Sequence, residues 1–182
     1  MTQVPVIAVV GPSGVGKDSV MTALATRDPR VHLIRRVITR PEDAGGEAFT
    51  GVSRQEFEAM RAAGAFALSW EAHGLCYGVP MPSEVKQADA RALLVNLSRG
   101  VLLRAQEVFH PFAVLSLTAR PEVLAARLAA RGREDAAEQA RRLGRAGMAL
   151  PEGVRRVITV DNSGPLERTV DAVLAHLQRE SA

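Results

Sequence analysis

Apolar runs of strand length alternate with segments of helical character along this chain. The runs at residues 4–10, 92–96 and 112–117 contain no charged side chain and predict strands buried within a sheet. A last strand is predicted at 154–160. The predicted helices lie at 17–27, 101–109, from Pro121 onward and at 165–178. Because strands and helices alternate at this spacing, the sequence predicts an α/β fold with a parallel sheet and helices on both faces.

The segment between the first two buried runs has a different pattern. A mixed strand is predicted at 31–39, followed by a loop at 41–51 that is rich in Gly, Glu and Asp. Ser53 and Glu56 have the spacing of a capping box and predict the start of a helix that ends at Gly64. Two short strands, at about 65–70 and 75–79, are expected to follow.

Residues 120–148 are rich in arginine. Two predicted helices, broken near Gly132, would form a helical hairpin that carries Arg127, Arg131, Arg133, Arg141, Arg142 and Arg145. A solvated helix face explains such a series in most proteins. Arginines that stabilise the charge of a transferred phosphoryl group are the functional alternative.

A glycine-rich loop follows the first predicted strand and opens the first predicted helix. It has the G-x-x-x-x-G-K spacing of a Walker A loop. Backbone N–H groups and the positive end of a helix cradle phosphates in such a loop, and the lysine reaches the β- and γ-phosphates. The sequence therefore predicts a nucleotide triphosphate site at Gly11, Pro12, Ser13, Gly14, Val15, Gly16, Lys17, Asp18 and Ser19.

The position after Lys17 departs from the Walker pattern. Asp18 stands where a Ser or Thr usually contacts magnesium, and Asn96 ends a strand where a Walker B aspartate would be common. Magnesium prefers oxygen ligands, and one or two carboxylates usually accompany the phosphate oxygens. We therefore expect Asp18 to be a Mg²⁺ ligand, with the alternative that it only caps the helix start.

Composition narrows the class of ligand. The 182 residues fit one domain, 1–182, with a net charge of +3. Only Lys17 and Lys86 of the 23 basic residues are lysine. Arginine suits phosphate binding, although a genome rich in G and C explains the same excess. One Trp and one Tyr leave no basic surface interleaved with aromatic residues, so small acidic ligands are favoured over nucleic acid.

Cys76 is the single cysteine and cannot form an internal disulfide. This favours a reducing, cytoplasmic location. The first apolar run is too short for a signal segment or a membrane span, so we expect no membrane association. The sequence leaves a homodimer open.

Several motifs together resemble guanylate kinase across most of the chain. They are the loop at residues 11–17, Thr39-Arg40-Pro41, His73-Gly74-x-x-Tyr77-Gly78 and Arg131-Gly132. A subgroup, the ribose 1,5-bisphosphate phosphokinases of phosphonate breakdown, is more similar. That resemblance rests on Gly16-Lys17-Asp18-Ser19, Val37-Ile38-Thr39-Arg40-Pro41 with Gly45-Gly46-Glu47, and Asn96-x-Ser98-Arg99.

The resemblance implies a three-layer P-loop fold with a helical lid at about 120–148 and a small acceptor-binding insertion at about 35–80. It implies synthesis of 5-phosphoribosyl 1-diphosphate from ATP and ribose 1,5-bisphosphate, a small phosphorylated sugar. The catalytic residues would be Lys17, Arg131 and Arg142, and the acceptor would contact Arg36, Arg40, Tyr77, Asn96 and Arg99.

The departures from guanylate kinase concern recognition of the base. The acidic residue that would accept hydrogen bonds from guanine falls at Leu68, and the hydroxyl that would follow falls at Val79. A guanine bound there would lose its hydration without gaining partners. A nucleoside monophosphate kinase with a divergent base pocket, or a guanylate-kinase-like module without turnover, are the alternatives. The intact Gly11, Gly16 and Lys17 disfavour the second.

Overall fold

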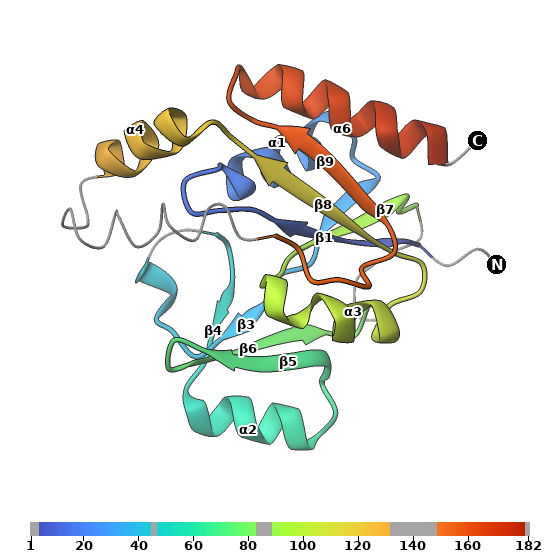
Figure 1. The fold of residues 1–182 in the computed structure, drawn as a ribbon. Coiled ribbons are helices and arrows are strands. Elements are labelled where there is room, and N and C mark those ends of the chain that lie inside the picture. The colour runs from blue at the N-terminus through green and yellow to red at the C-terminus, as the bar shows by residue number, and fades with distance from the viewer. Residues whose placement is uncertain (1–3, 45–46, 83–88, 132–148, 181–182) are drawn as a thin grey trace.

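The computed structural model describes residues 4–44, 47–82, 89–131 and 149–180. Over these residues, five strands form a parallel sheet in the order β2-β7-β1-β8-β9 (Figure 1). In sequence order they are β1 (Val6–Val10), β2 (Val31–Leu33), β7 (Ala92–Asn96), β8 (Phe112–Thr118) and β9 (Val157–Asp161). All five residues of β1 are buried, which places this continuous apolar run in the middle of the sheet.

Helices cover both faces of the central sheet, as the sequence predicts. On one face, α1 (Lys17–Arg27) and α6 (Leu166–Glu180) lie together, and α4 (Pro121–Arg131) follows β8 (Figure 1). On the other face lie α3 (Leu102–Val108) and a smaller sheet. The side chains of β1 alternate between two apolar cores: Ile7 and Val9 pack toward α1 and α6, and Ala8 and Val10 pack toward α3.

The smaller sheet comes from the region predicted as an insertion. Within the described residues it has four strands in the order β4-β3-β6-β5, and α2 (Arg54–Ala62) packs against it (Figure 1). The strands are β3 (Val37–Ile38), β4 (Thr50–Gly51), β5 (Phe66–Ala72) and β6 (Leu75–Pro80). The capping box is confirmed, because the Ser53 hydroxyl accepts from Glu56 N at 3.2 Å and Ser53 N donates to the Glu56 carboxylate at 2.7 Å.

A two-residue turn joins β5 to β6. His73 and Gly74 both have positive φ, at 52° and 75°, which suits the twist of a tight hairpin. The turn fixes the register of the two strands, so that Trp70 lies opposite Tyr77 and Leu68 lies opposite Val79. These four side chains share one face of the hairpin because alternate residues of a strand point the same way.

Two predicted strand boundaries are wrong. The segment 31–39 is not one strand: β2 leaves the central sheet after Leu33, and β3 belongs to the smaller sheet. The Ile34 N–H still bonds to the Leu94 carbonyl, but Arg35 is exposed and Arg36 turns inward. The last strand begins at Val157, three residues later than predicted. Arg155 N donates instead to the Gln106 side chain on α3, which keeps this residue outside the ladder.

Two short 3-10 helices complete the described elements, at Glu42–Ala44 and at Arg99–Val101. Of the predicted arginine-rich hairpin, the structure describes α4 as far as Arg131, and the rest lies outside the described residues. No helix in the described part of the chain is long and apolar enough to cross a membrane.

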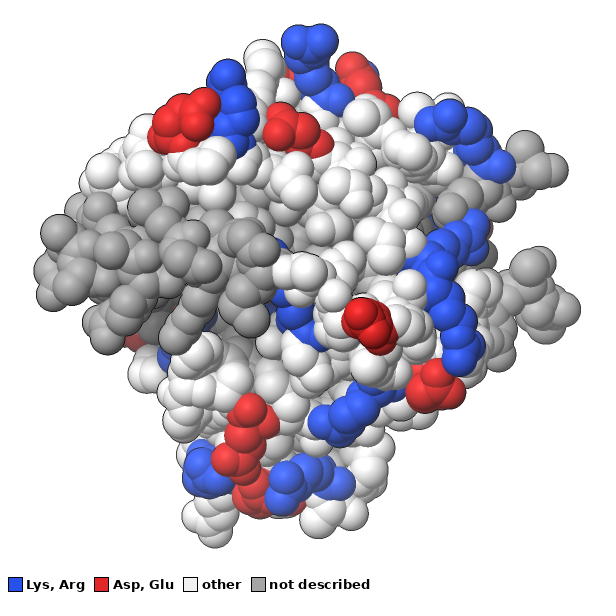
Figure 2. Space-filling model, viewed as in Figure 1, with Lys and Arg blue, Asp and Glu red and all other residues white. Residues whose placement is uncertain are grey.

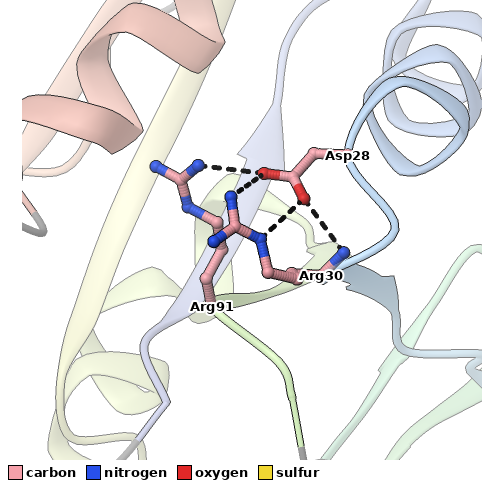
Figure 3. Close-up of polar contacts among 3 residues, drawn as sticks. All are labelled: Asp28, Arg30 and Arg91. Carbon is pink, nitrogen blue, oxygen red and sulfur yellow. Dashed lines mark hydrogen bonds and ion pairs between the residues drawn. The ribbon is translucent and has the colours of Figure 1, made fainter.

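Asp28 links the amino-terminal ends of two neighbouring strands of the central sheet (Figure 3). Its carboxylate accepts hydrogen bonds from the backbone and side chain of Arg30 and from Arg91, at 2.9–3.2 Å. Arg30 directly precedes β2 and Arg91 directly precedes β7, so one carboxylate ties the two strand starts together. These bonds, the Arg30 side chain first, lower the pKa of Asp28 to about 2.

Candidate active site

The glycine-rich loop connects the carboxyl end of β1 to α1, as the Walker spacing predicts. Gly14 and Gly16 have φ of 84° and 94°, a conformation that residues with a Cβ rarely adopt. α1 begins at Lys17, directly after the loop, so the positive end of the helix lies at the predicted phosphate cradle. The Lys17 ammonium donates to the Gly11 carbonyl at 3.1 Å.

Two side chains from distant segments support the loop. The Asn162 amide donates to the Val15 carbonyl at 2.7 Å, and Arg127 donates to the same carbonyl at 3.2 Å. Arg127 also donates to the Asn162 carbonyl at 2.8 Å. The buried Thr169 hydroxyl donates to the Asn162 side-chain oxygen at 2.6 Å, which fixes the orientation of the amide. The curvature of the loop is thus held by α4, the end of β9 and α6.

A cavity of about 840 Å³ lies between this loop and the smaller sheet. It brings together eight of the residues that the sequence predicts as site residues: Gly11, Pro12, Ser13, Lys17, Arg36, Tyr77, Asn96 and Arg99. The P-loop residues line one side, and Arg36 and Tyr77 belong to the smaller sheet or lie beside it. Asn96 ends β7 next to β1, and Arg99 follows three residues later.

The other predicted site residues lie elsewhere or outside the description. Gly14 and Val15 are buried within the loop, Asp18 is half-buried in the first turn of α1, and Ser19 is exposed. Arg40 lines a separate cavity of about 410 Å³, with its guanidinium 4.4 Å from the centre of the Phe49 ring. The side chain of Arg131 and all of Arg142 lie outside what the structure describes.

Arg36 is the most deeply buried cation of the cavity. Its side chain is 8% exposed and forms an ion pair with Glu47. Burial lowers the pKa of Arg36 to about 10, while the neighbouring Tyr77 and Asp18 oppose this shift, so the guanidinium stays charged at neutral pH. Its Nε atom is buried and has no hydrogen-bond partner among the described residues. A buried, fixed cation at a cavity wall suits an anionic group of a ligand.

The same wall lacks groups that would read a base at the two positions singled out in the sequence. Leu68 and Val79 are paired across β5 and β6, are 3% and 0% exposed, and belong to the core shared with α3. They lie next to the Trp70–Tyr77 pair on the same face of the hairpin. Neither side chain can accept or donate a hydrogen bond there.

Glu47 and Trp70 escape the sequence argument as site residues, and so does the way in which Arg127 and Asn162 support the loop. Trp70 could have been found, because a two-residue turn at His73–Gly74 sets the register that places it opposite Tyr77. Arg127 and Asn162 reach the loop from 112 and 147 residues away in sequence, and no local pattern indicates such contacts.

A cluster of possible metal ligands lies on the other face of the small sheet. Oxygen and sulfur atoms of Glu58, Glu71 and Cys76 come within 4.8 Å of one another. Glu71 pairs with Arg54 at 2.9 Å and Glu58 pairs with Arg61 at 2.5 Å, while Cys76 is fully buried. These pairs account for both carboxylates without a metal ion.

Comparison with known proteins identifies the family. The chain is 61% identical over 178 residues to the ribose 1,5-bisphosphate phosphokinase PhnN of Ruegeria sp. (strain TM1040), covering 98% of this chain and 94% of that protein. It is 43% identical to the protein of the same name from Agrobacterium fabrum (strain C58), covering 96% and 97% of the two chains. The chain belongs to the ribose 1,5-bisphosphate phosphokinase family. The kinase assignment from the sequence motifs is therefore confirmed.

Solved structures show the same fold at low identity. Guanylate kinase from Anaplasma phagocytophilum superposes with a TM-score of 0.60 at 19% identity, covering 98% of this chain and 86% of that one. A gluconokinase from Sinorhizobium meliloti 1021 superposes with a TM-score of 0.55 at 22% identity, covering 98% and 94%. Together with the parallel sheet, they confirm the predicted P-loop α/β fold. No model of a protein family matches the chain.

Proposed function

We propose that this protein transfers the terminal phosphoryl group of ATP to the 1-phosphate of ribose 1,5-bisphosphate, giving 5-phosphoribosyl 1-diphosphate and ADP. The observation that carries the proposal is the shared cavity. A phosphate-binding loop with Lys17 lines one side, and the cations Arg36 and Arg99 line the acceptor side. Family membership supplies the identity of the acceptor, since the relatives carry that name.

The chemistry of the acceptor fits a site built for positioning and charge neutralisation. The second pKa of a phosphate monoester is about 6, so at neutral pH the attacking oxygen is already deprotonated. The reaction therefore needs no general base. Lys17 would stabilise the charge that develops on the transferred group, and Arg36 would hold the acceptor in line with it.

Magnesium is the expected companion of ATP in this reaction, and the donor chemistry of the site fits it. Asp18 offers a half-buried carboxylate at the first turn of α1, and Asn96 offers an amide oxygen on the wall of the cavity. Bound with the nucleotide, the ion would neutralise phosphate charge. Asp18 also attracts the charge of Arg36, which lies on the acceptor side.

The remaining features of the proposal come from the sequence. Residues 1–182 would act as one kinase domain in the cytoplasm, where the buried free thiol of Cys76 stays reduced. Residues 120–148 would form the lid, and Arg131 and Arg142 would approach the transferred group when the lid closes. Arg40 would contact the acceptor from the neighbouring cavity.

A direct test compares two acceptors. Purified protein is incubated with ATP, magnesium and either ribose 1,5-bisphosphate or GMP, and the products are separated by anion exchange. We expect 5-phosphoribosyl 1-diphosphate and ADP from the first acceptor and no GDP from the second. GDP without 5-phosphoribosyl 1-diphosphate would instead support a guanylate kinase with a divergent base pocket, and no turnover with either would support a module without catalysis.

A further inference from the structure

Trp70 holds a position that the phosphoryl-transfer chemistry does not explain. It is the single tryptophan of the chain, lies on β5 and lines the cavity shared with the P-loop. Its ring stacks on that of Tyr77, with centroids 5.2 Å apart and an angle of 8° between the planes. Because the two residues are register partners, the hairpin itself holds the rings together. The pair forms a flat, rigid aromatic wall.

A fixed cation lies beside this wall. The Arg36 guanidinium carbon is 5.2 Å from the centre of the Tyr77 ring and 5.8 Å from that of Trp70. The ion pair with Glu47 and the burial of the side chain hold the guanidinium in place. The acceptor side of the cavity therefore offers a flat apolar surface with a positive charge beside it.

This combination matches a sugar phosphate. The faces of a furanose ring carry C–H groups that pack well on an aromatic ring, and the phosphates at its ends require cations. A purine could also stack on the wall, but the adjacent Leu68 and Val79 provide no partner for its polar edge. The surface thus favours the acceptor that has no base.

We propose that Trp70 is a specificity-determining residue: its indole, braced by Tyr77, packs against the pentose ring while Arg36 binds one of the phosphates. This inference rests on the proposed function, because it names how that acceptor is held. Trp70 also packs partly against the core shared with α3. A test therefore has to distinguish a purely structural role of Trp70 from a role in recognising the acceptor.

The first test uses Trp70 as its own reporter. Since no other tryptophan contributes, intrinsic indole fluorescence reports this position alone. Titration of the wild type with ribose 1,5-bisphosphate in the absence of ATP should change the emission in a saturable manner. GMP at the same concentrations, corrected for its absorbance, should not. Tryptophan emission that does not change at saturating ribose 1,5-bisphosphate would overturn the inference. An emission that changes in a saturable manner with GMP alone would overturn it as well.

The second test separates packing from recognition by steady-state kinetics. Trp70→Leu keeps apolar bulk against the core but removes the flat ring, whereas Trp70→Phe keeps a ring that can stack on Tyr77. For Trp70→Leu we expect the KM for ribose 1,5-bisphosphate to rise about tenfold, equivalent to about 1.4 kcal/mol, with the KM for ATP unchanged. Trp70→Phe should retain most of the affinity, with a rise below about threefold.

Phe66→Leu is the matched control. Phe66 lies on the same strand and stacks on Phe57 at 4.7 Å, but it contacts the α2 side of the sheet and does not line the cavity. This variant should lower the thermal midpoint without raising the KM for the acceptor. Equal increases of that KM in Phe66→Leu and Trp70→Leu would mean that general loosening of β5 explains the effect, and would overturn the inference.

The inference and the proposed function fail in different ways. Wild-type protein that makes no 5-phosphoribosyl 1-diphosphate overturns the function, and the inference with it. Wild-type turnover together with an unchanged acceptor KM in Trp70→Leu overturns the inference alone. A raised acceptor KM in a Trp70→Leu variant with a wild-type thermal midpoint supports it.

Discussion

Asn162 offers a quantitative test of how the phosphate-binding loop is held. Its side chain is 4% exposed and makes two short hydrogen bonds, to the Val15 carbonyl at 2.7 Å and from the Thr169 hydroxyl at 2.6 Å. Asn162→Ala removes both. The Val15 carbonyl keeps the longer bond from Arg127, and the Thr169 hydroxyl keeps only a 3.4 Å contact with the Asp161 carbonyl.

The magnitude follows from these contacts. Loss of the bond to the Val15 carbonyl, which keeps Arg127 as a partner, costs about 1 kcal/mol. The buried Thr169 hydroxyl, left without a good partner, costs about 1–2 kcal/mol more. We therefore expect Asn162→Ala to lower the free energy of unfolding by about 2–3 kcal/mol. Thr169→Val alone should cost about 1–2 kcal/mol, because it leaves the Asn162 oxygen without its donor. Because both substitutions remove the same bond between Asn162 and Thr169, the double variant should lose about 1 kcal/mol less stability than the two single losses added together.

Urea unfolding followed by far-UV circular dichroism measures these differences, provided that the m value does not change. Kinetics supply a second readout. Asn162→Ala should raise the KM for ATP several-fold because the Val15 carbonyl loses its shorter support, whereas Thr169→Val should affect it less. Strictly additive losses in the double variant, or an Asn162→Ala variant within about 0.5 kcal/mol of the wild type, would refute the reasoning.

Three further predictions concern individual charged groups. Lys17→Ala should lower kcat by about a hundredfold or more while the thermal midpoint changes little, since an oriented cation acts mainly on the transition state; near-normal kcat would contradict the kinase mechanism. Asp18→Asn should raise the magnesium concentration for half-maximal activity several-fold, and Asp18→Ser with Asn96→Asp should recover much of the loss; an unchanged magnesium titration would leave only an interaction with the positive end of α1, whose N-cap residue is Gly16. Asp28→Asn should lower the free energy of unfolding at pH 7 by about 1–2 kcal/mol. This value is smaller than the pKa shift alone implies, because solvent screens the interaction with the exposed Arg30. Because the folded-state pKa of Asp28 is depressed from 3.8 to about 2, this stabilisation is present above pH 4 and is lost as the pH falls toward 2, so the wild-type and variant stability curves should converge there.

The central sheet could be predicted from the sequence because its signals are local and strong. β7 has the predicted bounds, Ala92–Asn96, and α1 has the predicted bounds, Lys17–Arg27. A strand buried on both faces reads as an uninterrupted apolar run, and the glycine-rich loop fixes where the first helix begins. Neither signal depends on a distant part of the chain.

The smaller sheet could be predicted only in part. β3 and β4 contain two residues each, which is too short for a periodic pattern. The sequence therefore predicts a single strand over 31–39, where the structure has β2 and β3 in two different sheets. The burial of Arg36 could not be predicted from the sequence either, because arginine is usually exposed. Glu47, eleven residues away, and the aromatic pair on β5 and β6 create its environment only after folding.

The two halves of the site therefore differ in how they are encoded. The nucleotide side is one continuous segment, whereas the acceptor side is assembled from the start of β3, the β5–β6 hairpin and the end of β7. Asp18 and Arg36 connect the halves, because the carboxylate stabilises the charged guanidinium. Removing that carboxylate should weaken magnesium binding, but Arg36 stays charged at neutral pH without it, so acceptor binding at saturating magnesium should not weaken. The acceptor KM of Asp18→Asn should consequently be measured at saturating magnesium, where we expect it not to rise; a clear rise under that condition would contradict this electrostatic argument and would mean that Asp18 also positions Arg36.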